Sequence, residues 1–360
     1  MTASWLKELT KKKEKTPAVK SGELLSTGST LLNLALSGKK NGGLPPGHVY
    51  LFVGDSQAGK TWLAKTIMAE ACKSNFYKEY RLIDDNPERG ALMDIPKYFG
   101  KTLAGRLEKP NSKGHSVTSE DFYDNVDDAV REGKPFIYTL DSEDALQPES
   151  AIKKAKKDKN ARRKSSDNGE EVKGSYGTEK AKINSSGLRA AHNGMEDTKS
   201  ILIIIKQTRE NIGFNAVFNP KTRSGGKALS FYCSVEVWFS VKGKIKKTVR
   251  GKARVVGTIL RIHIKKNRVS GRDRTIDIPF FVQYGLDDLL SCINFLVEEK
   301  HWTGKENSVN APEFNFSGSK DKLIQLIEEG NREKELRSLT ETVWNELEAE
   351  LTTKRKPRYV

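Results

Sequence analysis

The chain of 360 residues carries 63 lysines and arginines against 47 aspartates and glutamates, which gives a formal net charge of +16. Hydrophobic residues make up 36% of it, enough for a sizeable core, which argues against a wholly disordered chain. No apolar run approaches the ~18 residues of a transmembrane helix, and the N-terminus lacks the apolar stretch of a secretory signal. Three widely spaced cysteines match neither a disulfide framework nor a zinc site. We therefore expect an intracellular protein whose charge suits a polyanion.

The positive charge is clustered. Residues 1–20 hold six lysines against two glutamates, and residues 151–189 hold twelve basic residues against five acidic ones. Residues 241–274 hold thirteen basic residues and a single aspartate, whereas residues 320–350 are acidic. Such clusters are typical of nucleic-acid binding, although a solvated basic face is the alternative on charge alone.

The order of predicted elements favours an α/β fold. A short helix around Trp5–Leu9 and a basic linker are followed by a helix over 31–36, a buried strand over 48–53, a glycine loop and a helix over 61–73. Further strands are predicted over 80–84, 136–141, 201–206, 235–241, 258–264 and 276–282, with helices over 91–99, 119–132 and 186–197. This alternation predicts a mostly parallel sheet covered by helices on both faces, with an antiparallel edge formed by the later strands.

Two regions stand apart from this pattern. Residues 145–190 are polar and charged without apolar periodicity, so we expect a long functional or disordered loop there. After Trp302 the sequence predicts a loop through Pro312 and helices over 319–329 and 332–352, whose apolar stripe we interpret as the core of a small cap domain. The predicted organisation is an N-terminal segment over 1–22, a core over 23–300 and a C-terminal helical cap over 301–360.

A complete G-x-x-x-x-G-K-[ST] motif connects the strand at 48–53 to the helix at 61–73. It reads Gly54-Asp55-Ser56-Gln57-Ala58-Gly59-Lys60-Thr61, and we call it the phosphate loop. Its backbone N–H groups and the helix N-terminus suit phosphates, Lys60 suits the β/γ-phosphates, and the Thr61 hydroxyl suits Mg²⁺. We therefore predict ATP and Mg²⁺ as cofactors, with binding without turnover as the alternative. Asp141 ends an apolar strand and is the candidate to hold Mg²⁺ through water, unless it merely starts a turn.

Further motifs follow in a diagnostic order. They are Ser26-Thr27-Gly28-Ser29, the turn Gly42–Gly47, the run Ile205–Gly213 containing Gln207, and Gly225-Gly226-Lys227-Ala228-Leu229-Ser230-Phe231-Tyr232-Cys233-Ser234-Val235. Together with the phosphate loop they resemble the RecA-type recombinase family over about residues 23–350. The basic 145–190 insert is longer than its counterpart in bacterial RecA, which suggests a bacteriophage-type member. The resemblance implies a RecA-like core with a small C-terminal helical domain.

The resemblance also implies DNA-binding segments. Gln207 would sense the γ-phosphate and pass that signal to a mobile DNA-binding loop over 208–226. The loop candidates are Arg209, Phe214, Phe218, Lys221, Arg223, Gly225 and Gly226. The two phenylalanines could instead belong to the core. The insert occupies the place of the family's other DNA-binding loop, with candidates Lys153, Lys154, Lys156, Arg162 and Arg163, or it is a disordered electrostatic tether.

The match to the family is less complete at the catalytic positions. Lys266 and Arg268 would reach the nucleotide of a neighbouring subunit, or else belong to a basic DNA face. The position expected for the general base holds Asn86, which cannot accept a proton from water. We therefore rank Glu88 first for this role, Asp85 second and a crippled ATPase third. The aromatic residue expected to stack on adenine near 95–99 is not clearly placed.

The resulting hypothesis is a DNA-dependent ATPase that assembles as a helical filament on single-stranded DNA and promotes pairing and strand exchange with double-stranded DNA. It would act in recombination and repair in the cytoplasm of a prokaryotic or phage-infected cell, at the nucleoid, with single-strand-binding or loader proteins and no membrane. An accessory or scaffold protein with weak hydrolysis is one alternative. A hexameric helicase-type motor is the other, and the run at 225–235 argues against it.

Overall fold

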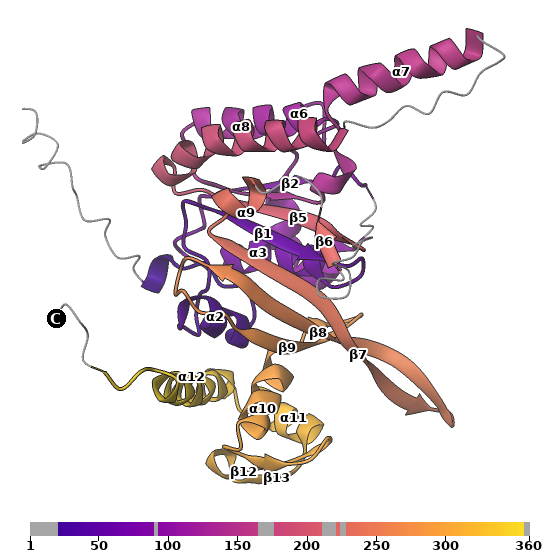
Figure 1. The fold of residues 1–360 in the computed structure, drawn as a ribbon. Coiled ribbons are helices and arrows are strands. Elements are labelled where there is room, and N and C mark those ends of the chain that lie inside the picture. The colour runs from indigo at the N-terminus through magenta and orange to yellow at the C-terminus, as the bar shows by residue number, and fades with distance from the viewer. Residues whose placement is uncertain (1–20, 90–92, 165–175, 211–220, 224–227, 356–360) are drawn as a thin grey trace, which may run out of the picture.

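The computed structural model describes residues 21–89, 93–164, 176–210, 221–223 and 228–355, so the helix predicted around Trp5 lies outside the described residues. The main sheet has ten strands in the order β10-β9-β8-β7-β1-β5-β4-β2-β3, with β6 paired to β5 (Figure 1). Its strands are β1 (His48–Gly54), β2 (Arg81–Asp85), β3 (Leu107–Glu108), β4 (Phe136–Leu140), β5 (Ile201–Glu210), β6 (Lys221–Arg223), β7 (Val235–Val249), β8 (Lys252–Asn267), β9 (Thr275–Phe281) and β10 (Gly285–Leu286). Strands β3, β2, β4, β5, β1 and β7 run parallel, and β8, β9 and β10 form an antiparallel edge, as predicted.

Helices cover both faces of the sheet, so the central strand β1 is buried on both sides. Tyr50 and Phe52 pack with α3 (Lys60–Lys73) and α2 (Thr30–Ser37). Val49, Leu51 and Val53 pack on the opposite face with α6 (Ser119–Arg131) and α8 (Tyr176–Asp197). A strand whose successive side chains enter two cores reads as a continuous apolar run, which is why the sequence predicted it correctly. The remaining short helices are η1 (Ser21–Glu23), α4 (Ile95–Phe99), α5 (Lys101–Arg106), η2 (Glu143–Ala145), α9 (Ala228–Tyr232) and η4 (Pro312–Phe314).

Strands β7 and β8 form a hairpin much longer than the predicted strands. Phe239 of β7 is in register with Gly54, the last residue of β1, and β7 continues for ten residues beyond that point. The hairpin therefore projects past the edge where the parallel strands end (Figure 1). Its tip is rich in lysine and exposed on both faces, so no apolar run marked it in the sequence.

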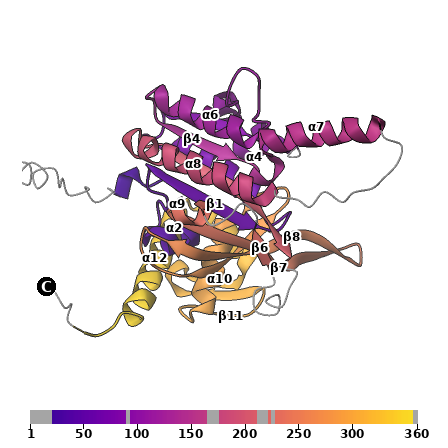
Figure 2. The same cartoon turned by 45° about the horizontal axis from the view of Figure 1, so that its top comes forward.

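The prediction of a long loop over 145–190 is wrong for residues 149–164 and 176–190, which are helical, whereas residues 165–175 lie outside the described residues. Residues 149–164 form α7 (Glu149–Lys164), which projects from the body of the protein, and α8 begins at Tyr176, ten residues before the predicted helix (Figures 1 and 2). The buried face of α8 consists of Asn184, Leu188, Ala191 and Met195. This spacing is helical, but polar and small members conceal it from a search for apolar periodicity.

The C-terminal part contains α10 (Asp288–Glu298), α11 (Lys320–Glu329) and α12 (Glu333–Glu350). The segment predicted as a loop through Pro312 instead forms a small antiparallel sheet of β11 (Thr303–Gly304), β12 (Ser308–Ala311) and β13 (Phe316–Ser319). Trp344 of α12 packs on Phe295 of α10, with ring centroids 5.5 Å apart. The domain boundary at residue 300 stays a prediction. No helix in the described ranges has the length and apolar character needed to cross a membrane.

Candidate nucleotide site

The phosphate loop connects β1 to α3 at the edge where the parallel strands end. Gly59 has φ 82°, in the left-handed region, and a Cβ there would lie 2.6 Å from Leu260 Cδ1. At Gly54 a Cβ would lie 2.5 Å from the carbonyl oxygen of Phe239. Only glycine satisfies both the backbone conformation and the close approach, which explains why the motif requires it. Ser56 and Gln57 are exposed at the tip of the loop, whereas Ala58 is buried beneath it.

Lys60 is a buried cation held by the loop itself. Its Nζ donates to the carbonyl oxygens of Gly54 at 2.9 Å and Asp55 at 2.6 Å. Burial lowers the pKa of Lys60, and the nearby carboxylates of Asp141 and Asp55 oppose that shift. An ammonium group that is bound only by neutral carbonyls is arranged to receive an anion at the loop.

Thr61 and Asp141 meet at the centre of the site. The Thr61 hydroxyl donates to Asp141 Oδ2 at 2.5 Å, which joins the start of α3 to the end of β4. Burial raises the pKa of Asp141, and the hydrogen bond from Thr61 opposes the shift. A hydroxyl and a carboxylate are hard oxygen ligands that suit Mg²⁺. Within the described residues no group of three or more His, Cys, Asp or Glu is placed to hold a metal ion.

Glu88 and Gln207, which are 119 residues apart in the chain, lie together beside this pair. Gln207 Nε2 donates to Glu88 Oε1 at 3.1 Å, and the Ser142 hydroxyl, next to Asp141, donates to the same oxygen. The backbone N–H of Gln207 donates to Asp144 Oδ2 at 2.7 Å. The ends of β2, β4 and β5 thus bring an exposed carboxylate, an amide and a hydroxyl into one cluster, as parallel strands do at their carboxyl ends.

Asp85, the second candidate for the general base, does not belong to the cluster of Glu88 and Gln207. It is fully buried, and its carboxylate accepts hydrogen bonds from the backbone N–H and hydroxyl of Ser116 and from the Tyr138 hydroxyl at 2.7 Å. Burial raises the pKa of Asp85, and these hydrogen bonds oppose the shift. The structure does not bring it to the phosphate loop. Asn86 is also engaged, since its N–H donates to His115 Nδ1 at 2.9 Å and its side-chain oxygen accepts from the N–H of Arg89.

A buried ion cluster behind Gln207 was not predicted from the sequence. Lys206 is 0% exposed and pairs with Glu143, which is also buried. Lys180 of α8 lies 3.3 Å from Glu143, and Asn184 of α8 donates to it at 2.8 Å. The cluster therefore connects α8 to the strand end that carries Gln207. Lysine directly after an apolar strand was the available signal, but nothing in the sequence identified its partner.

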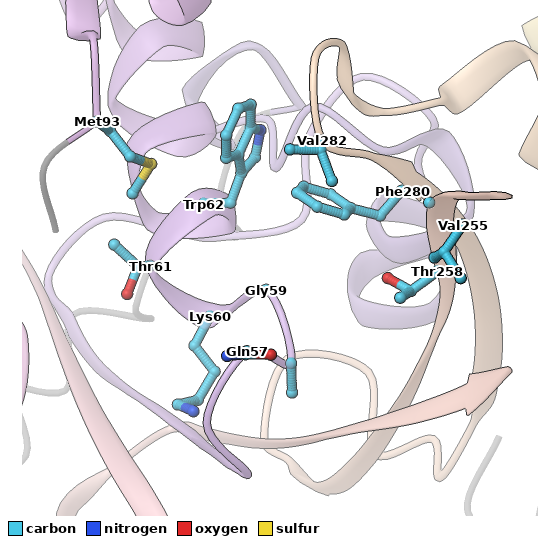
Figure 3. A pocket seen from close by; sticks show the side chains of 12 residues that line it. Gln57, Gly59, Lys60, Thr61, Trp62, Met93, Val255, Thr258, Phe280 and Val282 are labelled. Atoms are coloured by element: carbon cyan, nitrogen blue, oxygen red, sulfur yellow. The ribbon is translucent and has the colours of Figure 1, made fainter. Parts of the chain in front are cut away.

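An apolar pocket adjoins the phosphate loop. It has a volume of about 370 Å³, and its far wall is formed by the strands β8 and β9 (Figure 3). Gln57, Lys60 and Thr61 line the side next to the phosphate loop, and the rest of the pocket is lined mainly by Trp62, Met93, Val255, Thr258, Phe280 and Val282. Trp62 contacts Tyr98, Phe99 and Phe280, with ring centroids 5.0, 5.0 and 5.2 Å away. No position for an aromatic base-binding residue was clear from the sequence. Trp62, directly after Thr61, lines this pocket, whereas the prediction looked for an aromatic residue only near 95–99.

Lys266 and Arg268 are not near the phosphate loop of their own chain. Lys266 Nζ donates to the carbonyl oxygens of Phe231 at 3.1 Å and Cys233 at 2.7 Å, and Arg268 donates to Phe231 at 3.2 Å. Burial lowers the pKa of Lys266. Both residues therefore lie at the C-terminal end of α9, beside Phe231, whose side chain is 65% exposed.

The predicted DNA-binding residues are only partly described. Arg209, Lys221 and Arg223 belong to the short β5–β6 ladder, so residues 208–210 and 221–223 of the predicted loop are paired strands. Phe214, Phe218, Gly225 and Gly226 lie outside the described residues. Lys153, Lys154 and Lys156 are exposed on α7, and Arg162 and Arg163 lie farther along the same helix.

A parallel sheet whose central strand enters a helix through this loop defines an α/β protein of the P-loop class. Residues 8–287 match the family described as the RecA N-terminal domain, so the chain belongs to the RecA family. It is 28% identical over 284 residues to Protein RecA of Chlorobaculum tepidum, an alignment that covers 78% of this chain and 72% of that protein. It is 32% identical over 249 residues to Protein RecA of Laribacter hongkongensis, covering 69% and 61%. For Protein RecA of Cytophaga hutchinsonii the identity is 27% over 283 residues, covering 76% and 68%.

Proposed function

We propose that the protein is an ATP-dependent recombinase that forms helical filaments on single-stranded DNA and promotes homologous pairing and strand exchange. The observation that carries this proposal is the cluster of Glu88 and Gln207 beside the Thr61–Asp141 pair. Gln207 belongs to β5, and β5 continues directly into the loop at 208–226. A contact made at the nucleotide can therefore alter the position of a DNA-binding segment through one strand.

In this proposal the phosphate loop and Lys60 bind the phosphates of ATP, and the apolar pocket with Trp62 binds the base. Thr61 and Asp141 would hold Mg²⁺, which supplies charge neutralisation at the phosphates when bound. Glu88 orients the attacking water and accepts its proton. Lys266 and Arg268 act on the nucleotide of a neighbouring subunit in the filament, for which the exposed Phe231 supplies part of the contact.

DNA would bind along the edge past which the basic elements project. The hairpin tip and α7 extend to the same side of the body in both views (Figures 1 and 2). Substituting Lys246 and Lys247 together by glutamine should reduce the slope of log affinity against log salt by up to about 1.4, since each phosphate contact on a single strand contributes about 0.7. The matched control is the exposed pair Lys322→Gln and Lys334→Gln in the C-terminal helices.

The decisive experiment measures ATP hydrolysis with and without single-stranded DNA, together with joint-molecule formation. Lys60→Ala should lose ATP-dependent DNA binding and strand exchange. Glu88→Gln should retain nucleotide binding and filaments but lose about 100-fold or more in turnover, because general-base catalysis contributes that much. The exposed Glu329→Gln is the control. Strand exchange that survives Lys60→Ala would refute the proposal, and unchanged turnover in Glu88→Gln would refute the assigned base.

One observation favours a second candidate, a RecA-like scaffold that binds ATP without efficient hydrolysis. The position at which the resemblance implies the general base holds Asn86, whose backbone N–H donates to His115 and whose side-chain oxygen accepts from the N–H of Arg89. Filaments on DNA with negligible DNA-stimulated turnover and no joint molecules would select this function. Turnover that DNA stimulates and that depends on Glu88 would exclude it.

A further inference from the structure

A second, polar cavity lies on the other side of the turn that carries Glu88. It has a volume of about 540 Å³ and is lined by Asp84, Asn86, Arg89, Lys109, Lys113, Gly114 and His115. Among the described residues that line it there is no phenylalanine, tyrosine, tryptophan or aliphatic side chain, in contrast to the pocket beside Trp62. The lining is polar, so a ligand in this cavity would be recognised by charge and hydrogen bonding.

The charge of this cavity is positive and uncompensated. Its only acidic residue, Asp84, already forms an ion pair with the buried Lys65. In the part of the chain that the structure describes, the side chains of Arg89, Lys109 and Lys113 have no ion-pair or hydrogen-bond partner. Three cations held around one concave surface repel one another unless an anion binds between them.

His115 adds a directed donor. Its Nδ1 accepts the backbone N–H of Asn86 at 2.9 Å, so in the neutral ring the hydrogen is carried by Nε2. An N–H donor, a guanidinium group and two ammonium groups can bond to several oxygen atoms of one tetrahedral anion. A carboxylate offers two oxygen atoms to these groups and a smaller charge, whereas a phosphate offers up to four oxygen atoms in a tetrahedral arrangement.

The loop that carries these groups is held by a chain of buried polar side chains. Asp85 accepts from Ser116, the Ser116 hydroxyl accepts from Asn125 at 2.9 Å, and Asn125 accepts from Asn111 at 2.6 Å. Asn111 in turn accepts the backbone N–H groups of Lys113 and Gly114 at 2.8 and 3.1 Å. Asp85, Ser116 and Asn125 are each at most 6% exposed. Such a satisfied network fixes the loop before any ligand arrives.

We propose that this cavity is a phosphate-binding site, distinct from the phosphate loop, that takes a free phosphate ion or one phosphodiester of a nucleic-acid strand. The cavity adjoins the turn that carries Glu88: Asn86 and Arg89 of this turn line the cavity, while Glu88 contacts Gln207 and Ser142. The site stands on its own geometry and does not require that the protein be a recombinase.

The test uses the imidazole of His115 as a local probe. The chain has five histidines, so full-length protein labelled with ¹³Cε1-histidine gives at most five signals, and His115→Gln identifies the relevant one. Inorganic phosphate should shift the His115 signal saturably, whereas chloride and acetate at equal ionic strength should not. The shift should persist in Lys60→Ala, which separates this site from the phosphate loop.

Variants and a second ligand complete the experiment. Lys109→Ala with Lys113→Ala should weaken the apparent phosphate affinity by about tenfold or more, while Lys322→Ala with Lys334→Ala should not change it. A thymidine oligonucleotide that shifts the signal at lower concentration than phosphate identifies a nucleic-acid strand as the source, and a shift with phosphate alone identifies the free ion. No shift with either ligand, an equal shift with acetate, or an unchanged affinity in the double variant would overturn the proposal.

Discussion

The ion pair between Lys206 and Glu143 yields the sharpest stability prediction. Both side chains are at most 2% exposed, so replacing Lys206 by methionine leaves the Glu143 carboxylate buried without its closest cation. Breaking a buried pair in this way typically destabilises a protein by 3–5 kcal/mol. Glu143 keeps Lys180 at 3.3 Å and Asn184 at 2.8 Å, so we expect the lower end, about 3 kcal/mol.

The assay is thermal and urea unfolding of full-length variants. At an unfolding entropy of about 2.1 cal/mol/K per residue over 360 residues, a loss of about 3 kcal/mol corresponds to a fall in Tm of roughly 4 °C. The control is Lys153→Met, which removes an exposed pair on α7 with side chains 71% and 48% exposed and should change stability by less than about 0.5 kcal/mol.

A double variant separates lost attraction from buried charge. Lys206→Met with Glu143→Leu removes both charges and should recover at least half of the loss, because an apolar pair of similar volume is often as stable as a buried ion pair. Lys180 keeps the carbonyl oxygens of residue 143 and Leu146 at 2.7 Å in that variant. A Tm of Lys206→Met within 2 °C of wild type, or a double variant less stable than the single one, would refute the reasoning.

Three further predictions concern single substitutions. Gly59→Ala forces a Cβ to within 2.6 Å of Leu260 at a backbone φ of 82°. The substitution should destabilise the protein by about 1–3 kcal/mol and abolish binding of a fluorescent ATP analogue, and intact binding would contradict this prediction. Trp62→Ala should lower the affinity for the same analogue by about tenfold, since aromatic stacking contributes about 1–3 kcal/mol. An affinity equal to that of wild type would exclude the apolar pocket as the base site. Hydrogen bonds from Arg274 lower the pKa of Glu348, so Glu348→Gln should reduce the free energy of unfolding by about 2 kcal/mol at pH 7. The difference in stability from wild type should vanish as pH falls below the usual range of a glutamate. A difference that persists in acid would show that charge is not its cause.

The central sheet was predictable from the sequence because its signals are local. Strand β1 is an unbroken apolar run, and the motif that follows it fixes the turn and the start of α3 within eight residues. The same holds for the antiparallel edge at β9. In each case the burial that stabilises the element is recorded in neighbouring residues, so a window of a few residues suffices.

Elements stabilised by distant partners were not predictable in the same way. The cluster of Lys206 depends on Glu143 and on α8, which are brought together only by the order of the strands. The pocket beside Trp62 needs Phe280, more than 200 residues later in the chain. The hairpin tip has no core, so it continues through backbone pairing in a sequence that looks like a solvated basic stretch. Spatial chemistry of this kind requires the tertiary structure.

The end of β2 shows how environment, more than sequence position, decides what a carboxylate can do. Asp85 and Glu88 are three residues apart and were both candidates for the general base. Asp85 is fully buried, with donors on both oxygen atoms, so it is closed to solvent water, and burial disfavours its ionised form. Glu88 lies on the exposed turn after Pro87, where its carboxylate reaches Gln207 and Ser142. One acid therefore holds the loop of the polar cavity in place while the other remains open to the nucleotide side, and Asp85→Asn should disturb the cavity whereas Glu88→Gln should not.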